Sequence, residues 1–167
     1  MSRRLQAGLL AVLILAAAGL WMWRYAAPSH EREITRRLHD FADEFNVASI
    51  DGLATIARAA RLGQFFTDDI VVELGSGSPP IHGRDTLMGM AARLQPRTAA
   101  FVLELNDIGV TMLDSTRANT VLTAVIRRRT IGSGEQSLDA REFSVELRKI
   151  DAEWRVSRVA AVETLRK

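Results

Sequence analysis

The chain has 167 residues, a formal net charge of +2 from 22 Lys and Arg against 20 Asp and Glu, and no cysteine. Its 47% hydrophobic and 25% charged content is typical of a globular protein and excludes a disordered one. Acids and bases are interleaved, so no nucleic-acid-binding face is indicated, and the lack of cysteine excludes disulfides, thiolate chemistry and cysteine zinc sites.

An uncharged hydrophobic segment occupies residues 5–23. A helix of these 19 residues, rising about 1.5 Å per residue, nearly crosses the roughly 30 Å hydrocarbon core of a bilayer. Two arginines precede the segment, and tryptophans, an arginine and a tyrosine close it, as is typical of a membrane–water interface. We expect residues 1–25 to be a single-pass anchor, followed by a hinge at 26–30. The alternative is a cleavable signal peptide that ends near residues 16–18.

The distribution of arginines around this segment bears on its orientation. Arg3, Arg4 and the amino group favour keeping the short tail inside the cell. Arg24, Arg32 and two further arginines on the other side weaken this preference. The expectation is a protein of the bacterial inner (cell) membrane whose domain, residues 31–167, faces the periplasm or the exterior.

Three helices are expected in the first half of the domain. Hydrophobic residues recur at helical spacing from Ile34 to Phe45, which predicts an amphipathic helix with one buried face. A second helix is expected at residues 52–62 and ends at Gly63; its inner face would carry Leu53, Ile56, Ala57 and Ala60. A third runs from Asp85 or Thr86 to residue 94, before a proline.

Strand patterns surround and follow the third helix. Residues 70–74 indicate a short strand, followed by a Gly/Ser/Pro loop. From Phe101 onward the hydrophobic period becomes two, which predicts strands that begin at Phe101 and lie near residues 118–126, 143–147 and 154–162, with alternation extending to Arg158 in the last. Residues 109–113 continue the first of these strands or form a separate one. Helices grouped before antiparallel strands predict an α+β domain whose helices pack on one sheet face.

Residues 66–84 carry the most specific pattern in the chain. An aromatic residue, Thr-Asp-Asp, Val-Val-Glu and Pro-Pro-Ile-His-Gly-Arg follow one another there. This stretch resembles the SnoaL-like and ketosteroid-isomerase-like family of the nuclear transport factor 2-like superfamily, and residues 150–156 resemble its final hairpin. The resemblance covers about residues 31–167 and implies a cone-shaped fold, a curved antiparallel or mixed sheet around three helices. It also implies a homodimer through the convex sheet face.

The same resemblance argues against the isomerase reaction. Isomerases of this family need a carboxylate base with tyrosine and aspartic acid hydrogen-bond donors. Leu74 occupies the base position, the only tyrosine is Tyr25, and Glu146 near the second donor position should point away from the interior. We therefore expect the isomerase chemistry to be absent.

Other residues are weaker candidates for chemistry. His82 could act as an acid or base, and Glu73 and Asp43 are carboxylates near the expected pocket or on the first helix. More ordinary roles are a helix entry for His82, a solvated or salt-bridged strand position for Glu73, and a helix surface for Asp43. His39 and Asp43 lack a third metal ligand, so no metal or cofactor is expected.

The implied cone would have an apolar lining. The family resemblance places six side chains around it, namely Phe41, Phe45, Phe66, Val72, Leu74 and Met88. The run of three arginines at 127–129 would be a solvated hairpin tip or a contact for anionic lipid or a partner.

Three functional hypotheses follow. The leading one is a membrane-anchored, non-catalytic module that binds a small apolar ligand or a protein partner outside the cytoplasm. The second is an isomerase, dehydratase or hydrolase acting on a small lipophilic substrate. The third is an assembly subunit of an envelope complex.

Overall fold

The computed structural model describes residues 29–47, 52–75, 77–93, 99–130 and 136–162. Three helices and six strands lie in these ranges: α2 (His30–Asn46), α3 (Gly52–Gly63), β1 (Phe66–Glu73), β2 (Ile81–His82), α4 (Arg84–Arg93), β3 (Ala99–Met112), β4 (Arg117–Thr130), β5 (Gln136–Ile150) and β6 (Glu153–Ala161). The predicted anchor at residues 5–23 lies outside them. None of the helices in the described ranges is long and apolar enough to cross a membrane.

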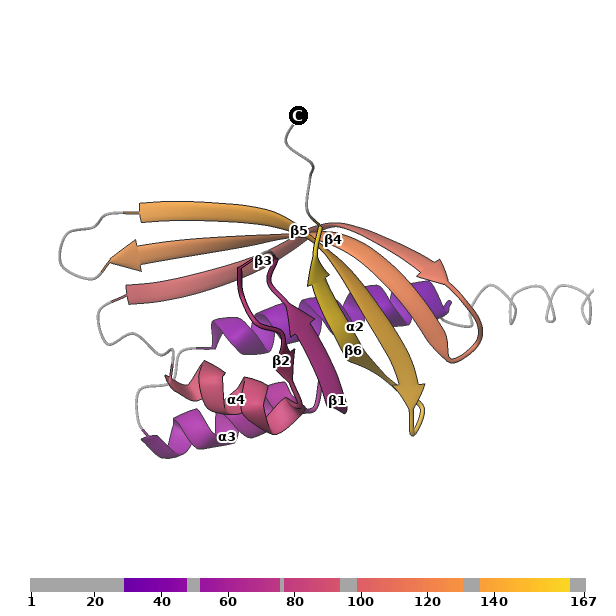
Figure 1. Ribbon diagram of the computed structural model, residues 1–167, viewed down its shortest axis with the longest axis horizontal. Helices are drawn as coiled ribbons and strands as arrows, with labels where there is room; N and C mark the ends of the chain where they lie inside the picture. Colours follow the sequence, from indigo (N-terminus) through magenta and orange to yellow (C-terminus); the bar gives the residue numbers. More distant parts are fainter. Residues whose placement is uncertain (1–28, 48–51, 76, 94–98, 131–135, 163–167) are drawn as a thin grey trace, which may run out of the picture.

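The six strands form one sheet in the order β2-β1-β6-β5-β4-β3. Neighbouring strands are antiparallel except β1 and β6, which run parallel. Figure 1 shows the sheet curving over α2, with α3 and α4 grouped below it. The predicted α+β architecture, a curved sheet around three helices, is therefore confirmed for the described residues. We call the sheet side that faces α2 the concave face and the opposite side the convex face.

Helix α2 lies on the concave face and carries the centre of the core. Ser29 caps its first turn, because the Ser29 hydroxyl accepts a hydrogen bond from the backbone N–H of Arg32. Ile34 and Leu38 are 0% and 4% exposed, as their spacing predicts. At the other end, the Asn46 amide bonds both backbone groups of Leu103, at 2.8 and 2.9 Å, which attaches the helix to β3.

Helix α3 turns a different face inward from the one its sequence indicates. Ile56 is 69% exposed, and Ala57 and Ala60 are exposed as well. The half-buried or buried side is instead formed by residues that follow helical spacing, namely Ala54, Thr55, Arg58, Ala59 and Leu62. The prediction was wrong because alanines lie on all sides of this helix, so hydrophobicity alone defines its inner face poorly.

Two strands differ from their predicted course because of bulges. Residues 101–112 belong to one strand, β3, whose pairing with β4 shifts between Asn106 and Gly109. The pairing of β5 with β6 shifts between Glu146 and Leu147. Since an extra residue reverses the side to which later side chains point, Arg158 faces outward instead of continuing the alternation of Trp154 and Val156. Strand β1 also begins earlier than predicted, at Phe66.

Candidate functional site

A single polar side chain interrupts an apolar row that crosses the concave face. The row takes one residue from each strand in register: Val110, Thr120, Val145, Val159, Val72 and Ile81. Thr120 is 0% exposed, and its hydroxyl has no hydrogen-bond partner in the described part of the chain. A buried hydroxyl without a partner costs about 1–3 kcal/mol, so this group is poised to accept or donate a hydrogen bond.

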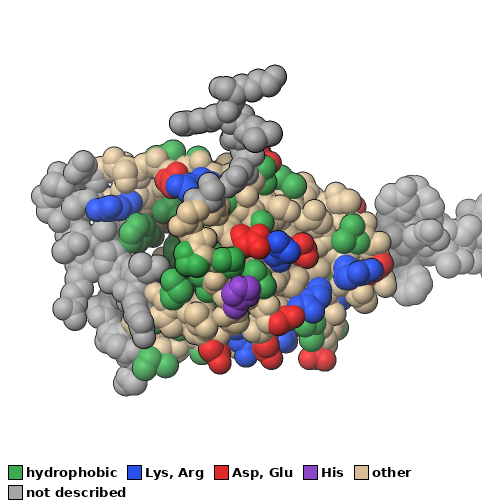
Figure 2. Space-filling view, viewed as in Figure 1, with side chains coloured by type: hydrophobic (Ala, Val, Ile, Leu, Met, Phe, Trp, Pro, Cys, Tyr) green, Lys and Arg blue, Asp and Glu red, His purple; other side chains and the backbone are tan. Residues whose placement is uncertain are grey.

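Beyond this row, the concave face becomes more accessible toward the start of β3 and β5. Phe101 and Phe143 are half-buried there, and Ile126 is 39% exposed. We call this region, with Leu103, Leu105, Leu122 and Ala124 beneath it, the open end of the concave face. Figure 2 shows a hollow bordered by hydrophobic side chains on the side of the molecule where β3 begins. The region offers an apolar surface with charged residues at its rim.

The predicted pocket-lining residues are distributed over several environments. Phe66 and Val72 are buried in the core, whereas Phe41, Phe45 and Met88 are half-buried and pack against it. The Phe41 ring lies edge-on to those of Phe65 and Phe66, with centroids 5.5 and 5.4 Å away. Leu74 is 45% exposed at the end of β1. Their role as a ligand lining stays a prediction.

The candidate catalytic residues are not brought together. Both oxygens of Glu73 accept hydrogen bonds at 2.9 Å from one nitrogen, Nη2, of the Arg158 guanidinium, which holds this carboxylate in an ion pair. His82 pairs with Val71 across the β1–β2 ladder, so both side chains point to the convex side, and the imidazole is exposed. Asp43 is exposed on α2. None of the three faces the apolar row.

Two other charged features are exposed at the surface. Glu146 is exposed on β5, as its predicted outward direction requires. The described residues contain no cluster of three or more His, Cys, Asp or Glu side chains that could hold a metal ion. Of the three consecutive arginines, Arg127 pairs with Glu104 at 3.0 Å, and all three are exposed.

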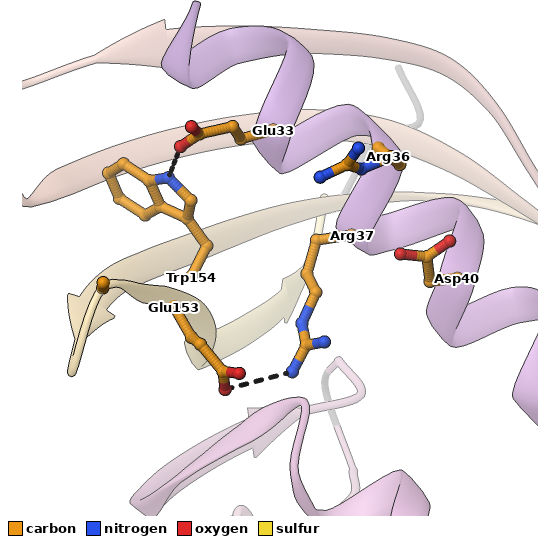
Figure 3. A pocket seen from close by; sticks show the side chains of 7 residues that line it. Glu33, Arg36, Arg37, Asp40, Glu153 and Trp154 are labelled. Carbon is orange, nitrogen blue, oxygen red and sulfur yellow. Dashed lines mark hydrogen bonds and ion pairs between the residues drawn. The ribbon is translucent and has the colours of Figure 1, made fainter. Parts of the chain in front are cut away.

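A separate cleft of about 250 Å³ lies between α2 and the turn that joins β5 to β6. Glu33, Arg36, Arg37, Asp40, Ala152, Glu153 and Trp154 line it, as Figure 3 shows. Glu33 accepts a hydrogen bond from the Trp154 indole at 3.2 Å, and Arg37 lies 3.7 Å from Glu153. The mostly charged lining makes this cleft a poor site for an apolar molecule.

The contacts beside this cleft close one end of the concave face. Glu33 contacts His30 at 3.2 Å and Lys149 at 3.1 Å, and the His30 ring packs edge-on against Trp154. Hydrogen bonds from His30 and then Lys149 lower the pKa of Glu33 below its usual value of 4.5. We call Glu33, His30, Lys149 and Trp154 the closed end, because their polar groups are engaged with one another.

Sequence reasoning missed the site residues that depend on strand register. Thr120 belongs to an alternating series with Ala118, Leu122, Ala124 and Ile126. A single hydroxyl among these inward positions could have indicated a polar group on the inner face. The same even-numbered series continues to Arg128, and the odd-numbered series through Phe143 extends back to Arg141. Both arginines could have been assigned to the inner face by this parity alone.

Comparisons with solved structures agree on the fold. A candidate scytalone dehydratase from Novosphingobium aromaticivorans aligns with a TM-score of 0.64 and 16% identity, covering 80% of this chain and 83% of that one. A ketosteroid isomerase-like protein from Erwinia carotovora atroseptica aligns with a TM-score of 0.57 and 18% identity, covering 79% and 95%. At such identities the likeness concerns the fold alone.

Comparisons by sequence give the family. No curated protein matches the chain. The model of the SnoaL-like domain, however, matches residues 49–160, which is more than half of the sequence. The chain belongs to the SnoaL-like domain family.

Proposed function

We propose that this chain is a non-catalytic SnoaL-like module that binds a small, largely apolar molecule at the open end of its concave face. The observation that carries the proposal is the composition of that face. Apolar side chains from β3, β4 and β5 remain partly exposed at the open end, and the unpartnered Thr120 hydroxyl lies further in on the same face. An apolar surface with one convergent polar group is typical of a small-molecule site.

The absence of turnover rests on where the acid–base groups lie. General acid–base catalysis requires a titratable group within hydrogen-bond reach of the reacting atom. Glu73 is held by Arg158 on the convex side, while His82 and Asp43 are exposed away from the apolar row. Leu74, at the position of the isomerase base, has no titratable group.

An isomerase, dehydratase or hydrolase acting on a small lipophilic substrate is the alternative. Its support is the fold shared with the candidate scytalone dehydratase. Such an enzyme would need His82, Glu73 or Asp43 to reach the ligand, which requires strand β1, strand β2 or helix α2 to turn an outward side chain inward.

We further propose that residues 5–23 hold the module at a bacterial inner (cell) membrane with its domain facing the periplasm or exterior, and that the module is a homodimer. The uncharged 19-residue segment supports the anchor. Val102, Val121 and Leu138 are 42%, 41% and 63% exposed on the sheet and support a convex-face dimer. Retention of the full chain in membranes after an alkaline carbonate wash tests the anchor; release into the wash would indicate a cleaved signal.

Two matched probes test the binding proposal. Naphthalene and 2-naphthol share one ring system, and only 2-naphthol carries a hydroxyl. The full chain in nanodiscs of zwitterionic lipid should bind both saturably above an empty-nanodisc blank. The hydrogen bond to Thr120 should favour 2-naphthol by about five- to tenfold, since such a bond contributes about 1 kcal/mol or slightly more.

Variants of two threonines on opposite faces of β4 make this test specific. Thr120→Val should abolish the preference for 2-naphthol while leaving naphthalene binding unchanged. Thr123→Val, on the convex side of the same strand, should change neither. No saturable binding of either probe would contradict the proposed function. An unchanged preference in Thr120→Val would exclude Thr120 from the site.

A further inference from the structure

The register at the open end turns two arginines onto the concave face. Arg128 pairs with Phe101 on β3 and Ser137 on β5, and Arg141 pairs with Ala124 on β4. Side chains directly opposite in a ladder point to the same side, and alternate residues of a strand share a side. Arg128 therefore follows Leu122, Ala124 and Ile126 on the concave face, and Arg141 precedes Phe143 there.

The remaining arginines of the basic run belong to the other side of the sheet. Arg127 pairs with Glu104 at 3.0 Å on the convex face, and Arg129 alternates with Arg128. The three-arginine run is thus divided, with one guanidinium on the concave face and two on the convex face. Sequence order alone makes the run appear to be one patch.

Within the described ranges, the rim of the open end carries more positive than negative charge. Arg141 lies 3.3 Å from Asp139, an exposed ion pair on β5. Arg128 is exposed and has no ion-pair partner in the described ranges of the chain. Among the described residues, two guanidinium groups beside one carboxylate leave a net charge of +1 next to the half-exposed Ile126.

The pairing along β4 gives the distances of the two arginines from Thr120 along the strand. Arg141 is opposite Ala124, four residues from Thr120, and Arg128 is eight residues from Thr120. At about 3.3 Å per residue, these steps correspond to roughly 13 and 26 Å along the strand. Ala124 lies opposite Arg141, and Ile126 lies between Ala124 and Arg128 along β4. These two side chains offer the apolar surface.

We infer that the molecule bound at this site is an apolar carboxylic acid, whose carboxylate pairs with Arg128 or Arg141 while its hydrocarbon body covers Ala124 and Ile126. This inference rests on the proposed function and names its ligand class. The planar guanidinium matches a carboxylate with two parallel hydrogen bonds, and the hydrocarbon body removes the exposed side of Ile126 from water. A neutral molecule of the same shape gains only the second contribution.

A pair of isosteric probes separates the inference from the proposed function. 2-Naphthoate and 2-naphthamide have the same shape and differ in charge at pH 7. In equilibrium dialysis with the full chain in zwitterionic nanodiscs, blanked with empty nanodiscs, we expect naphthoate to bind about five- to tenfold more tightly at low salt. The preference should shrink as salt is raised toward 1 M, because the arginines are exposed.

The variants assign the effect to named residues. Arg128→Gln combined with Arg141→Gln should remove the preference for naphthoate and leave naphthamide binding unchanged. Arg129→Gln, a neighbour on the opposite face, should behave as wild type. Thermal unfolding of each variant establishes that it is folded, and the salt series on the wild-type chain gives a readout that needs no variant.

Each outcome has a distinct meaning. Equal binding of both probes to the wild-type chain would overturn the inference while the proposed function stands. Saturable binding of neither probe would overturn the proposed function, and the inference with it. A preference that persists in the double variant, or that disappears in Arg129→Gln, would overturn the assignment to Arg128 and Arg141.

Discussion

The two ends of the concave face differ in how their polar groups are engaged. At the closed end, the Glu33 carboxylate contacts His30, Lys149 and the Trp154 indole within 3.2 Å. At the open end, Phe101, Ile126 and Phe143 keep partly exposed apolar surface, and Arg128 has no ion-pair partner among the described residues. The polar groups at the closed end of the sheet are therefore paired with one another, whereas the open end keeps exposed apolar surface and an arginine without an ion-pair partner among the described residues.

This difference separates residues that stabilise the fold from residues available for binding. Contacts at the closed end attach the first turns of α2 to β5 and β6, and they leave few groups free for a ligand. Open-end side chains contribute less to the core because water still reaches them, so their surface is available for a partner molecule. Mutations in the closed part should therefore mainly lower stability, and mutations at the open end should mainly weaken binding.

The largest expected contrast comes from two isoleucines. Ile34→Ala removes a side chain that is 0% exposed between α2 and the sheet, and it should cost about 3 kcal/mol of unfolding free energy. Ile126→Ala, at 39% exposure, should cost about 1 kcal/mol and weaken naphthalene binding. Chemical denaturation and probe titration measure both. Equal losses of stability would contradict the division between the ends.

A smaller effect on stability is expected from a substitution at the closed end. Glu33→Gln keeps an acceptor for the Trp154 indole but removes the charge that faces Lys149, and it should cost about 1 kcal/mol at pH 7. The pKa of Glu33 is lowered in the folded state, so its stabilising effect is present above pH 4.5 and is lost as the pH falls below that value. Glu31→Gln, at an exposed residue of the same helical turn, is the control. A similar loss of stability in this variant would contradict the stabilising role of the closed end.

The smallest effect is expected at an exposed pair outside both ends. A hydrogen bond from Arg148, followed by one from Thr67, lowers the pKa of Asp69 from 3.8 to about 2. Since this carboxylate is 69% exposed, Asp69→Asn should cost less than about 1 kcal/mol. The difference from wild type should be present above pH 3.8 and should vanish as the pH falls toward 2, as acid unfolding curves can show. A difference that grows with acidity would contradict the ion pair.

Much of the fold followed from local patterns, whereas the site depended on pairing. The spacing of Ile34 and Leu38 was sufficient to predict the buried face of α2, because helical period and burial agree there. Ile56 misled because alanines surround it on α3. Arg158 misled because the bulge in the β5–β6 pairing cannot be read from alternation.

The site residues show the same limit more sharply. The alternation along the strand was sufficient to predict that Thr120 points inward. It could not predict that the Thr120 hydroxyl lacks a hydrogen-bond partner, because that depends on the neighbouring strands. The ion pair between Glu73 and Arg158 joins residues that are 85 positions apart, so the sequence could only leave open whether Glu73 is solvated, paired or in a pocket. Residue type indicated candidates, and long-range pairing determined their surroundings.

Methyl NMR of the full chain in nanodiscs, recorded during titration with 2-naphthamide, tests the central claim most directly. The probe should shift the methyl signals of Ile126 and Leu103 at the open end in a saturable manner. The methyl signals of Ile34 and Leu147, which lie in the buried core, should not shift. Saturable shifts of Ile34 and Leu147 without shifts of Ile126, or no saturable shift at any of the four, would contradict a ligand site at the open end of the concave face.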